Sequence, residues 1–353
     1  MMIQLKDLCQ KASSNIAQKD LEGHEGQYPI YGASGLIGYV DFYKQENPYV
    51  AVVKDGAGIG RVMCLPEKSS VIGTMQYILP NEGVNVHYLA FAMEHMNLAK
   101  YFSGATIPHI YFKDYCTERL PKNSEAEQKQ ISTTLSRVTE LISLRKQQLS
   151  KLDELVKARF VEMFGEPVSN PYKFEVRSLQ NMLDDGIITY HLDGNHGSDY
   201  PRNEEFVESG VSYISANCII DDTVNLNLAK HLTEERAAKL RKGIAQDEDV
   251  LFAHNATVGP VAILHTRETK VILGTSLTAY RCNKQRILPA YLKAYMQSEG
   301  FVRQYTKDMK QTTRNQVPIT AQRKYLFIVP PLSLQNQFAA FVERVDQQKQ
   351  TVQ

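Results

Sequence analysis

The sequence lacks the cysteine, hydrophobic and targeting patterns that mark several classes of protein. Its five cysteines, Cys9, Cys64, Cys116, Cys218 and Cys282, are scattered and form no C-x-x-C pair, which disfavours a structural zinc site and a disulfide scaffold. It has no window of about 18 apolar residues, which a transmembrane helix would need. The N-terminal "MMIQLKDLCQ" has no basic region followed by an apolar run, so no secretory signal is predicted. These absences favour a cytoplasmic protein.

The sequence also lacks an excess of charge of either sign. Lysine and arginine number 40 against 39 aspartate and glutamate residues, which gives a net charge of +1. The chain as a whole is therefore not a polycation, and any surface for nucleic acid must be local. The length of 353 residues allows about two domains.

No catalytic or nucleotide-binding motif is recognisable. The glycines of "GAGIG" (56–60) lie between two strand-like runs, and the P-loop pattern does not occur. A tight turn is the favoured interpretation, with contact of exposed N–H groups to a phosphate backbone as the alternative. His191 and His196 have no third ligand at metal-binding spacing, so both are predicted to be solvated loop histidines and no metal site is predicted. No catalytic residue can be nominated either.

What the sequence does contain is a long amphipathic helix near its middle. Residues 125–160 hold neither proline nor glycine, and seven of the nine positions of one heptad seam are apolar. The seam comprises Ile131, Leu135, Val138, Ile142, Arg145, Leu149, Leu152, Val156 and Arg159. A helix of about 38 residues is ~57 Å long, which exceeds an ordinary domain core, so the seam needs another long helix. A homodimeric coiled coil is one solution.

An internal repeat offers a second solution. With Gln335 placed over Gln128, the C-terminal stretch repeats the seam in the same phase, putting Phe338 on Ile131, Val342 on Leu135 and Val345 on Val138. Each copy follows a strand-like run that ends in proline, "CTERLP" or "KYLFIVPP". The central helix can therefore pair with the terminal helix of the same chain, antiparallel if a pseudo-two-fold axis relates the halves.

The regions ahead of the two helices also match in order. The matching pairs are 52–65 with 251–264 (Gly60 on Gly259), 71–74 with 272–275, 87–94 with 290–297, and 105–112 with 312–319, while "IQLKDL" resembles "VRSLQNML". We predict an α+β fold with two tandem globular domains, 1–121 and 167–331, each followed by a long helix, 122–166 and 332–353. Strands are expected at "YVAVVK" and "DVLFAH", and amphipathic helices at 86–102 and 289–305.

Basic and amide side chains gather in equivalent segments of the two halves. Segment 303–324 mixes six cations with Thr, Asn and Gln, and Arg, Asn and Gln can read base edges by paired hydrogen bonds. Segment 100–115 is its less basic counterpart, and a turn follows the first strand pair in each unit. A solvated helix end is the alternative interpretation. The candidate DNA-binding residues are Lys54, Arg61, His109, Tyr111, Lys113, His254, Asn255, Thr257, Lys307, Lys310, Thr312, Arg314, Asn315 and Gln316.

The tandem organisation resembles the specificity subunit of type I restriction-modification systems, over essentially the whole chain. "VPPLSLQNQFAAFVERVD", "VVKDGAGIGRV" and the repeat order carry the resemblance. It implies two target-recognition domains that each read half of a split sequence in double-stranded DNA, and an antiparallel coil as spacer. Methyltransferase subunits and a restriction and translocase subunit are the implied partners. The chain itself would then need no cofactor, because S-adenosylmethionine, ATP and Mg²⁺ would be bound by those partners.

The second helix is shorter than the resemblance implies. It covers about 20 residues against about 38 in the first, so about half of the first seam is expected to lack a partner. A docked subunit or a second copy is expected to cover Leu149, Leu152 and Val156. Two rival functions remain open at this point, which are a coiled-coil scaffold without a DNA role and a fragment of a stand-alone restriction or methylation enzyme.

Overall fold

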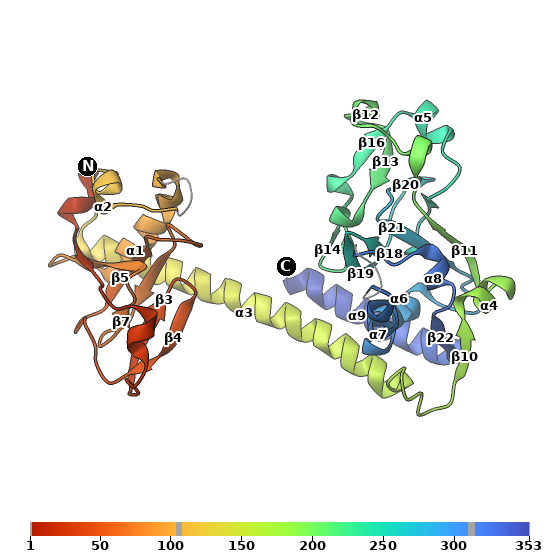
Figure 1. The fold of residues 1–353 in the computed structure, drawn as a ribbon, viewed down its shortest axis with the longest axis horizontal. Coiled ribbons are helices and arrows are strands. Elements are labelled where there is room, and N and C mark those ends of the chain that lie inside the picture. Colours follow the sequence, from red (N-terminus) through yellow and green to blue (C-terminus); the bar gives the residue numbers. More distant parts are fainter. Residues whose placement is uncertain (1, 104–107, 310–314, 353) are drawn as a thin grey trace. The chain divides into compact units, whose positions relative to one another are not determined.

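The computed structural model describes residues 2–103, 108–309 and 315–352 (Figure 1). The chain divides into two compact units, residues 1–144 (unit 1) and 145–353 (unit 2). The division falls within one helix, α3 (Glu125–Phe164), whose 40 residues include the predicted seam. The α+β fold predicted from the sequence is confirmed in both units.

Unit 1 is a small mixed structure built around a four-stranded sheet in the order β2-β8-β5-β6. Strands β4, β3 and β7 form a second sheet, and β1 pairs with β9. Helix α1 packs against β5 and β6, and Val50, Val52, Leu89 and Met93 are buried between them. The elements are β1 (Met2–Gln4), β2 (Cys9–Ser13), β3 (Tyr28–Gly32), β4 (Gly35–Val40), β5 (Tyr49–Val53), β6 (Val62–Leu65), β7 (Ser70–Val71), β8 (Met75–Pro80), α1 (Val86–His95), α2 (Phe112–Tyr115) and β9 (Arg119–Pro121).

Unit 2 has larger sheets, and the four strands β11-β21-β18-β19 of its main sheet correspond to β2-β8-β5-β6 of unit 1. Six strands follow the order β11-β21-β18-β19-β15-β14, five follow β12-β16-β13-β20-β17, and β10 pairs with β22. The strands are β10 (Glu175–Ser178), β11 (Ile188–Asp193), β12 (Phe206–Val207), β13 (Val211–Ile214), β14 (Ile219–Ile220), β15 (Thr223–Val224), β16 (Lys230–Leu232), β17 (Ile244–Ala245), β18 (Val250–Asn255), β19 (Thr257–Ile263), β20 (Val271–Leu273), β21 (Leu277–Cys282) and β22 (Leu326–Val329). The helices are α4 (Leu179–Asp184), α5 (Glu234–Ala238), α6 (Pro289–Gln297), α7 (Glu299–Met309), α8 (Ile319–Gln322) and α9 (Leu332–Val352).

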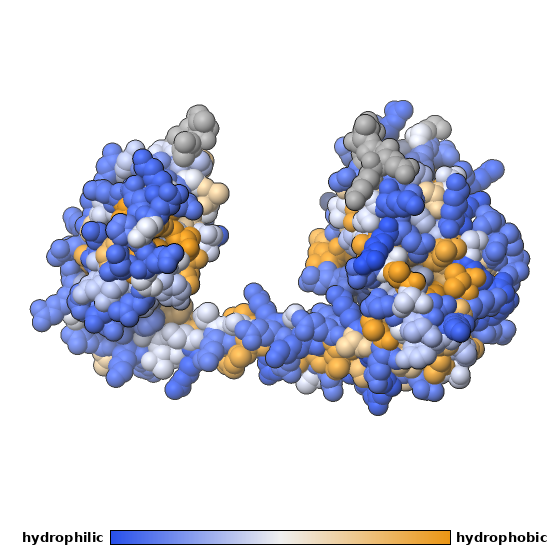
Figure 2. Space-filling model, turned by 60° about the horizontal axis from the view of Figure 1, so that its bottom comes forward, coloured by the Kyte–Doolittle hydropathy of each residue, from blue (hydrophilic) through white to orange (hydrophobic). Residues whose placement is uncertain are grey.

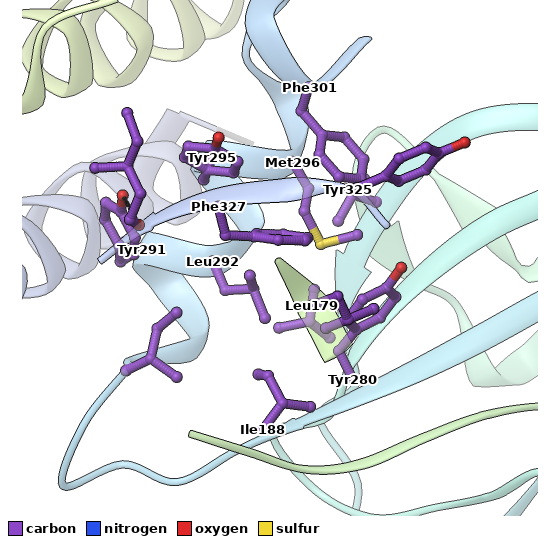
Figure 3. Packing of buried hydrophobic residues seen from close by; sticks show 14 of the residues in the cluster. Leu179, Ile188, Tyr280, Tyr291, Leu292, Tyr295, Met296, Phe301, Tyr325 and Phe327 are labelled. Atoms are coloured by element: carbon purple, nitrogen blue, oxygen red, sulfur yellow. Dashed lines mark hydrogen bonds between the residues drawn. The ribbon is translucent and has the colours of Figure 1, made fainter. Parts of the chain in front are cut away.

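The core of unit 2 is rich in aromatic side chains. Figure 3 shows Tyr291 and Tyr295 from α6 lying beside Phe327 of β22, with Phe301 of α7 near them. Tyr295 and Phe327 have ring centroids 5.3 Å apart. Burying several large rings in one cluster supplies much of the apolar area that holds α6 and α7 to the sheet. The single amphipathic helix predicted over 289–305 is divided at Ser298 into α6 and α7.

Local signals in the sequence explain where the long helix begins and ends. At its start Ser124 and Glu127 form a capping box, in which Glu127 Oε2 accepts from the Ser124 backbone N–H at 2.7 Å and Ser124 Oγ accepts from that of Glu127 at 3.4 Å. At its end Gly165 has a φ of +73°, and its N–H donates to Val161 O at 2.8 Å. A left-handed residue after the last turn is a common helix stop that glycine adopts without strain.

The internal repeat is confirmed by hydrogen bonds that recur in the two units. Gln128 Oε1 accepts from Asn85 N–H at 3.0 Å, and Gln335 Oε1 accepts from Leu288 N–H at 2.9 Å. Both glutamines are buried, and each ties the start of a long helix to the start of an amphipathic helix. The hydroxyl of Tyr88 likewise donates to Pro121 O at 2.9 Å, as the hydroxyl of Tyr291 donates to Ile328 O at 2.7 Å. The predicted superposition of Gln335 on Gln128 is therefore right.

The superposition of 52–65 on 251–264 is right only in its second half. Val52 pairs with Val62 in unit 1, whereas Phe252 pairs with Val261 in unit 2. Val52 therefore corresponds to Phe252 rather than to the Leu251 that the prediction chose. The turn of unit 2 is one residue shorter, so an ungapped match slips by one along the first strand. Gly60 and Gly259 do correspond, and both have positive φ.

Helix α9 packs antiparallel on the second half of α3, within unit 2. The ring of Phe338 lies 5.7 Å from that of Phe160 and 5.5 Å from that of Phe164, while Lys349 Nζ lies 2.6 Å from Asp153 Oδ1. Residue numbers thus rise along α9 as they fall along α3. The intramolecular antiparallel coil is confirmed over this stretch.

The prediction of which part of α3 stays uncovered is wrong. Because the pairing is antiparallel, α9 covers the later part of α3, and Leu149, Leu152 and Val156 are partly buried. Leu155 and Val161 are also exposed in the later part of α3. Five further exposed apolar side chains lie earlier, in unit 1, and Figure 2 shows hydrophobic patches among hydrophilic side chains along the helix. These residues are 39–58% exposed: Leu135, Val138, Leu141, Ile142 and Leu144. None of the helices in the described ranges is long and apolar enough to cross a membrane.

Candidate nucleic-acid interface

The turn after the central strand pairs with a distant segment in both units, and this pairing gathers most of the predicted site residues. In unit 1, Ile110 N–H donates to Lys54 O at 3.0 Å, and Gly56 N–H donates to Pro108 O at 3.1 Å. In unit 2, Val317 N–H donates to His254 O at 2.8 Å, and Ala256 N–H donates to Asn315 O at 3.0 Å. The predicted match of 105–112 with 312–319 is confirmed for the part that the structure describes, because Pro108 and Asn315 take equivalent places.

In unit 1 this pairing brings four of the five predicted side chains into one cluster. His109 Nδ1 contacts the Asp55 carboxylate, and Lys54 Nζ lies 3.6 Å from Asp55 Oδ2. The ring of His109 lies 4.0 Å from that of Tyr111, and Lys113 Nζ lies 5.3 Å from the centroid of Tyr111. Tyr111 and Lys113 are exposed. The cluster offers a cation, an imidazole and an aromatic face at one surface, which suits contact with phosphates and base edges.

The glycine turn of unit 1 is closed by its own hydrogen bonds. Ile59 N–H donates to Gly56 O at 3.2 Å, and Gly60 N–H donates to Val53 O at 2.8 Å. Gly60 has a φ of +81°, and a Cβ there would lie 2.5 Å from Ala99 N, so only glycine fits. The tight-turn interpretation is confirmed. Arg61 lies at the exposed end of this turn, where Nη1 donates to Ala33 O at 2.7 Å.

In unit 2 the described candidates lie around the same pairing. Asn255 forms a bridge with Gln316, and the adjoining Thr257 and Asn315 are exposed. Lys307 is exposed on α7. Three other predicted residues, Lys310, Thr312 and Arg314, lie outside the described residues.

His254 and His191 are buried, contrary to what a DNA contact or a solvated loop requires. His254 is 1% exposed and His191, on β11, is 4% exposed. Burial lowers the pKa of His191 to about 4 and also lowers the pKa of His254. His196 is exposed, and its Nε2 lies 2.8 Å from Asp193 Oδ2. Over the described ranges no three His, Cys, Asp or Glu side chains are grouped as metal ligands would be.

Sequence reasoning missed two residues of this region. Asp55 orients His109, and the only signal for it was its place next to Lys54 in the repeated turn. Gln322 is fully buried beneath segment 315–317, where Nε2 donates to Val317 O at 3.2 Å. Because the segment contains several exposed amide side chains, its sequence does not indicate which glutamine is buried and which is solvated.

Comparisons with known proteins find similar sequences and similar folds. Residues 1–154 match the family described as "Type I restriction modification DNA specificity domain". The chain is 21% identical over 340 residues to the type I restriction enzyme MjaVIII specificity subunit of Methanocaldococcus jannaschii, which covers 91% of this chain and 80% of the relative.

Solved structures share the fold. The S subunit of a type I restriction-modification system from M. genitalium has a TM-score of 0.65 at 14% identity, covering 100% of this chain and 90% of that one. A chain from a structural study of complex assembly in the type I R-M system has a TM-score of 0.50 at 14% identity, covering 100% and 91%.

The chain thus combines two units of repeated architecture with a pair of long helices. Its first 154 residues match a domain family whose known role is to recognise DNA sequence, and over its whole length the chain is similar in sequence and fold to specificity subunits of type I restriction-modification systems.

Proposed function

We propose that this chain reads a bipartite DNA target, with one half-site recognised by each unit. The observation that carries the proposal is the recurrence, in both units, of a polar turn paired with a polar segment by equivalent backbone hydrogen bonds. A repeated frame with different side chains suits two readers of different sequences. Base-edge contacts would set specificity, and exposed lysines such as Lys113 and Lys307 would supply affinity through phosphates.

The paired helices support a role as the spacer between half-sites. Half-sites that lie about one helical turn apart, ~34 Å, must be held in a fixed register. Helix α3 is continuous over 40 residues, which is ~60 Å at 1.5 Å per residue, and α9 stiffens its second half. A flexible linker of the same length would not fix a register.

We propose further that the chain acts through partner subunits. Specificity subunits are generally not catalytic themselves. Adenine methylation and cleavage of unmodified DNA would then belong to the methyltransferase and restriction subunits, which would also bind S-adenosylmethionine, ATP and Mg²⁺. The exposed apolar residues of α3 between Leu135 and Leu144 are available to a docked subunit.

An exchange of recognition units tests the proposal. Residues 1–120 are replaced by the corresponding unit of another specificity subunit, and the assembled methyltransferase is tested on a library of DNA targets by sequencing the methylated sites. We expect one half of the target to change and the other half to persist. A change in both halves, or in neither, would count against one reader per unit. Methyl transfer or cleavage by the purified chain alone would show that it is an enzyme in its own right.

A further inference from the structure

In unit 2, residues 315–317 form the described part of the segment that we predict to read DNA, and residues 108–110 are its counterpart in unit 1. We call each of these the reading segment of its unit. Two buried side chains hold the reading segment of unit 2 in place. Val317 is fully buried beside the end of β18. Its carbonyl oxygen accepts from His254 Nδ1 at 3.0 Å and from Gln322 Nε2 at 3.2 Å. The exposed Asn315 and the half-buried Gln316 directly precede this anchor. Their backbone is fixed by this anchor on one side and by the pairing of Asn315 and Gln316 with the turn on the other.

Gln322 is the centre of this anchor, because every polar atom of its amide is used. Its Oε1 accepts from the Tyr280 hydroxyl at 2.6 Å and lies 3.2 Å from His191 Nε2, while its Nε2 also donates to Thr278 Oγ1 at 3.2 Å. These partners come from β11 and β21, whereas Gln322 is the last residue of α8. The short helix after the reading segment is thereby fixed to the central strands.

The hydrogen-bond partners determine where both histidines carry their proton. A carbonyl oxygen only accepts, so His254 must be protonated on Nδ1, and His191 must be protonated on Nε2 to donate to Gln322 Oε1. Burial lowers the pKa of both rings, which favours these neutral forms. The other two ring nitrogens, His254 Nε2 and His191 Nδ1, are buried without a hydrogen-bond partner in the described part of the chain. Such unpaired groups cost stability, so the two histidines are not explained by stability alone.

Unit 1 has a different pair of side chains at the corresponding place. Gln76 of β8 donates to the hydroxyl of Tyr115, the last residue of α2. Both side chains are buried. Each unit therefore joins the short helix after its reading segment to a central strand by a buried polar contact, but glutamine is on the strand in unit 1 and on the helix in unit 2.

We propose that Gln322, with His254 and His191, is a positioning centre that holds segment 315–317 in the geometry needed to read one half-site. The inference rests on the proposed function, since it presupposes that unit 2 reads DNA. Gln322 would touch no base and would act through Val317. Loosening the anchor should lower discrimination between correct and altered half-sites while leaving phosphate contacts, and so non-specific affinity, in place.

The test uses the chain assembled with its methyltransferase subunits and a target first determined by methylation sequencing. Three DNA duplexes are compared, which are the intact target, one altered in the half-site of unit 1 and one altered in that of unit 2. Gln322→Met should reduce discrimination at the unit 2 half-site about tenfold, which corresponds to one or two lost hydrogen bonds, and change the other half-site less than about twofold. Tyr115→Phe should give the mirror result.

Two further comparisons separate positioning from general damage. Leu240→Ala removes a buried side chain in another cluster of unit 2 and should lower stability without changing discrimination. His254→Asn keeps an N–H near the position of Nδ1 and should retain discrimination, whereas His254→Leu should lose it. Nitrogen NMR of the histidines should show Nδ1–H on His254 and Nε2–H on His191.

The outcomes distinguish the two levels of the argument. If the unaltered assembly does not discriminate at either half-site, the proposed function fails. If it discriminates, and Gln322→Met keeps full discrimination at the unit 2 half-site, the positioning centre is refuted while the function stands. If Gln322→Met does not assemble, the His254 pair decides, and equal discrimination by His254→Asn and His254→Leu refutes the proposal.

Discussion

Units 1 and 2 share a backbone frame but hold it with different side chains. Gln128 and Gln335 make equivalent hydrogen bonds, and the two reading segments pair with equivalent turns. The side chains at the turns differ, with a partly exposed Lys54 in unit 1 and a buried His254 in unit 2. A frame that tolerates such exchanges would let one unit change its target without disturbing the other.

The largest difference should appear at the first turns of the two long helices. Phe338 and Ile131 are equivalent in the repeat, but Phe338 is fully buried against Phe160 and Phe164, whereas Ile131 is only partly buried. Phe338→Ala should cost about 3–5 kcal/mol of unfolding free energy, and Ile131→Ala about 1 kcal/mol. Urea unfolding of the purified chain measures both. Equal losses would mean that Ile131 is covered in the purified chain as fully as Phe338 is by α3.

The two units should respond most alike when their buried glutamines, Gln128 and Gln335, are replaced. Gln335 makes three hydrogen bonds, to Leu288 N, Arg286 O and Pro330 O, and Gln128 makes two, to Asn85 N and Asn123 O. Replacement by leucine leaves these backbone groups unsatisfied, so we expect a loss of about 3 kcal/mol for Gln335→Leu and about 2 kcal/mol for Gln128→Leu.

Exposed Gln348 on α9 provides the matched control for this pair. Gln348→Leu should change the unfolding free energy by less than about 0.5 kcal/mol in the same urea titration. Losses at Gln128 and Gln335 as small as that would mean that the shared hydrogen bonds do not stabilise the frame.

Each unit should determine the DNA sequence preference at one half-site only. Asn315→Ala should relax the preference at one half-site by about 1–3 kcal/mol, and His109→Ala should relax the other, because each removes a base-reading candidate from one unit. Lys307→Ala should weaken binding to all sequences alike and lower the salt slope by about 1. Fluorescence anisotropy with altered duplexes at several salt concentrations measures all three. A general loss with Asn315→Ala would reverse the assigned roles.

The backbone arrangement could be predicted from the sequence far better than the burial and contacts of individual side chains. The heptad seam and Gln335 over Gln128 could be found because periodicity and helix-start chemistry appear directly in the letters. The slip between Leu251 and Phe252 could not, because a turn shortened by one residue leaves the strand pattern unchanged. Burial of His254 was likewise hidden, since a histidine ending a strand reads the same whether it faces a core or solvent. The uncovered part of α3 was predicted wrongly because repeat equivalence matches the first turns of the two helices, whereas antiparallel pairing places the start of α9 beside the end of α3.

The smallest effect concerns a lysine for which unit 1 has no counterpart. Lys293 lies on α6 where unit 1 has Ala90, as the matched Tyr291 and Tyr88 show, and its Nζ donates to Asp222 O at 2.9 Å. Burial lowers its pKa below the ordinary 10.5, opposed by Asp222, Asp346 and Asp153 and assisted by Lys349. Between the lowered value and 10.5 this lysine binds more protons in the unfolded chain than in the folded one, so its own contribution to the unfolding free energy rises with pH, by at most about 1.4 kcal/mol per pH unit.

Urea unfolding over a pH series from neutral to about 10.5 should therefore show the unfolding free energy of the unaltered chain rising relative to that of Lys293→Met. Lys239→Met, at a side chain that is 64% exposed, should keep the original slope. Identical slopes for Lys293→Met and the unaltered chain would mean that the ammonium is as well solvated in unit 2 as in the unfolded state. In that case Lys293 would be an ordinary surface residue, unlike the buried Ala90 at the equivalent place in unit 1.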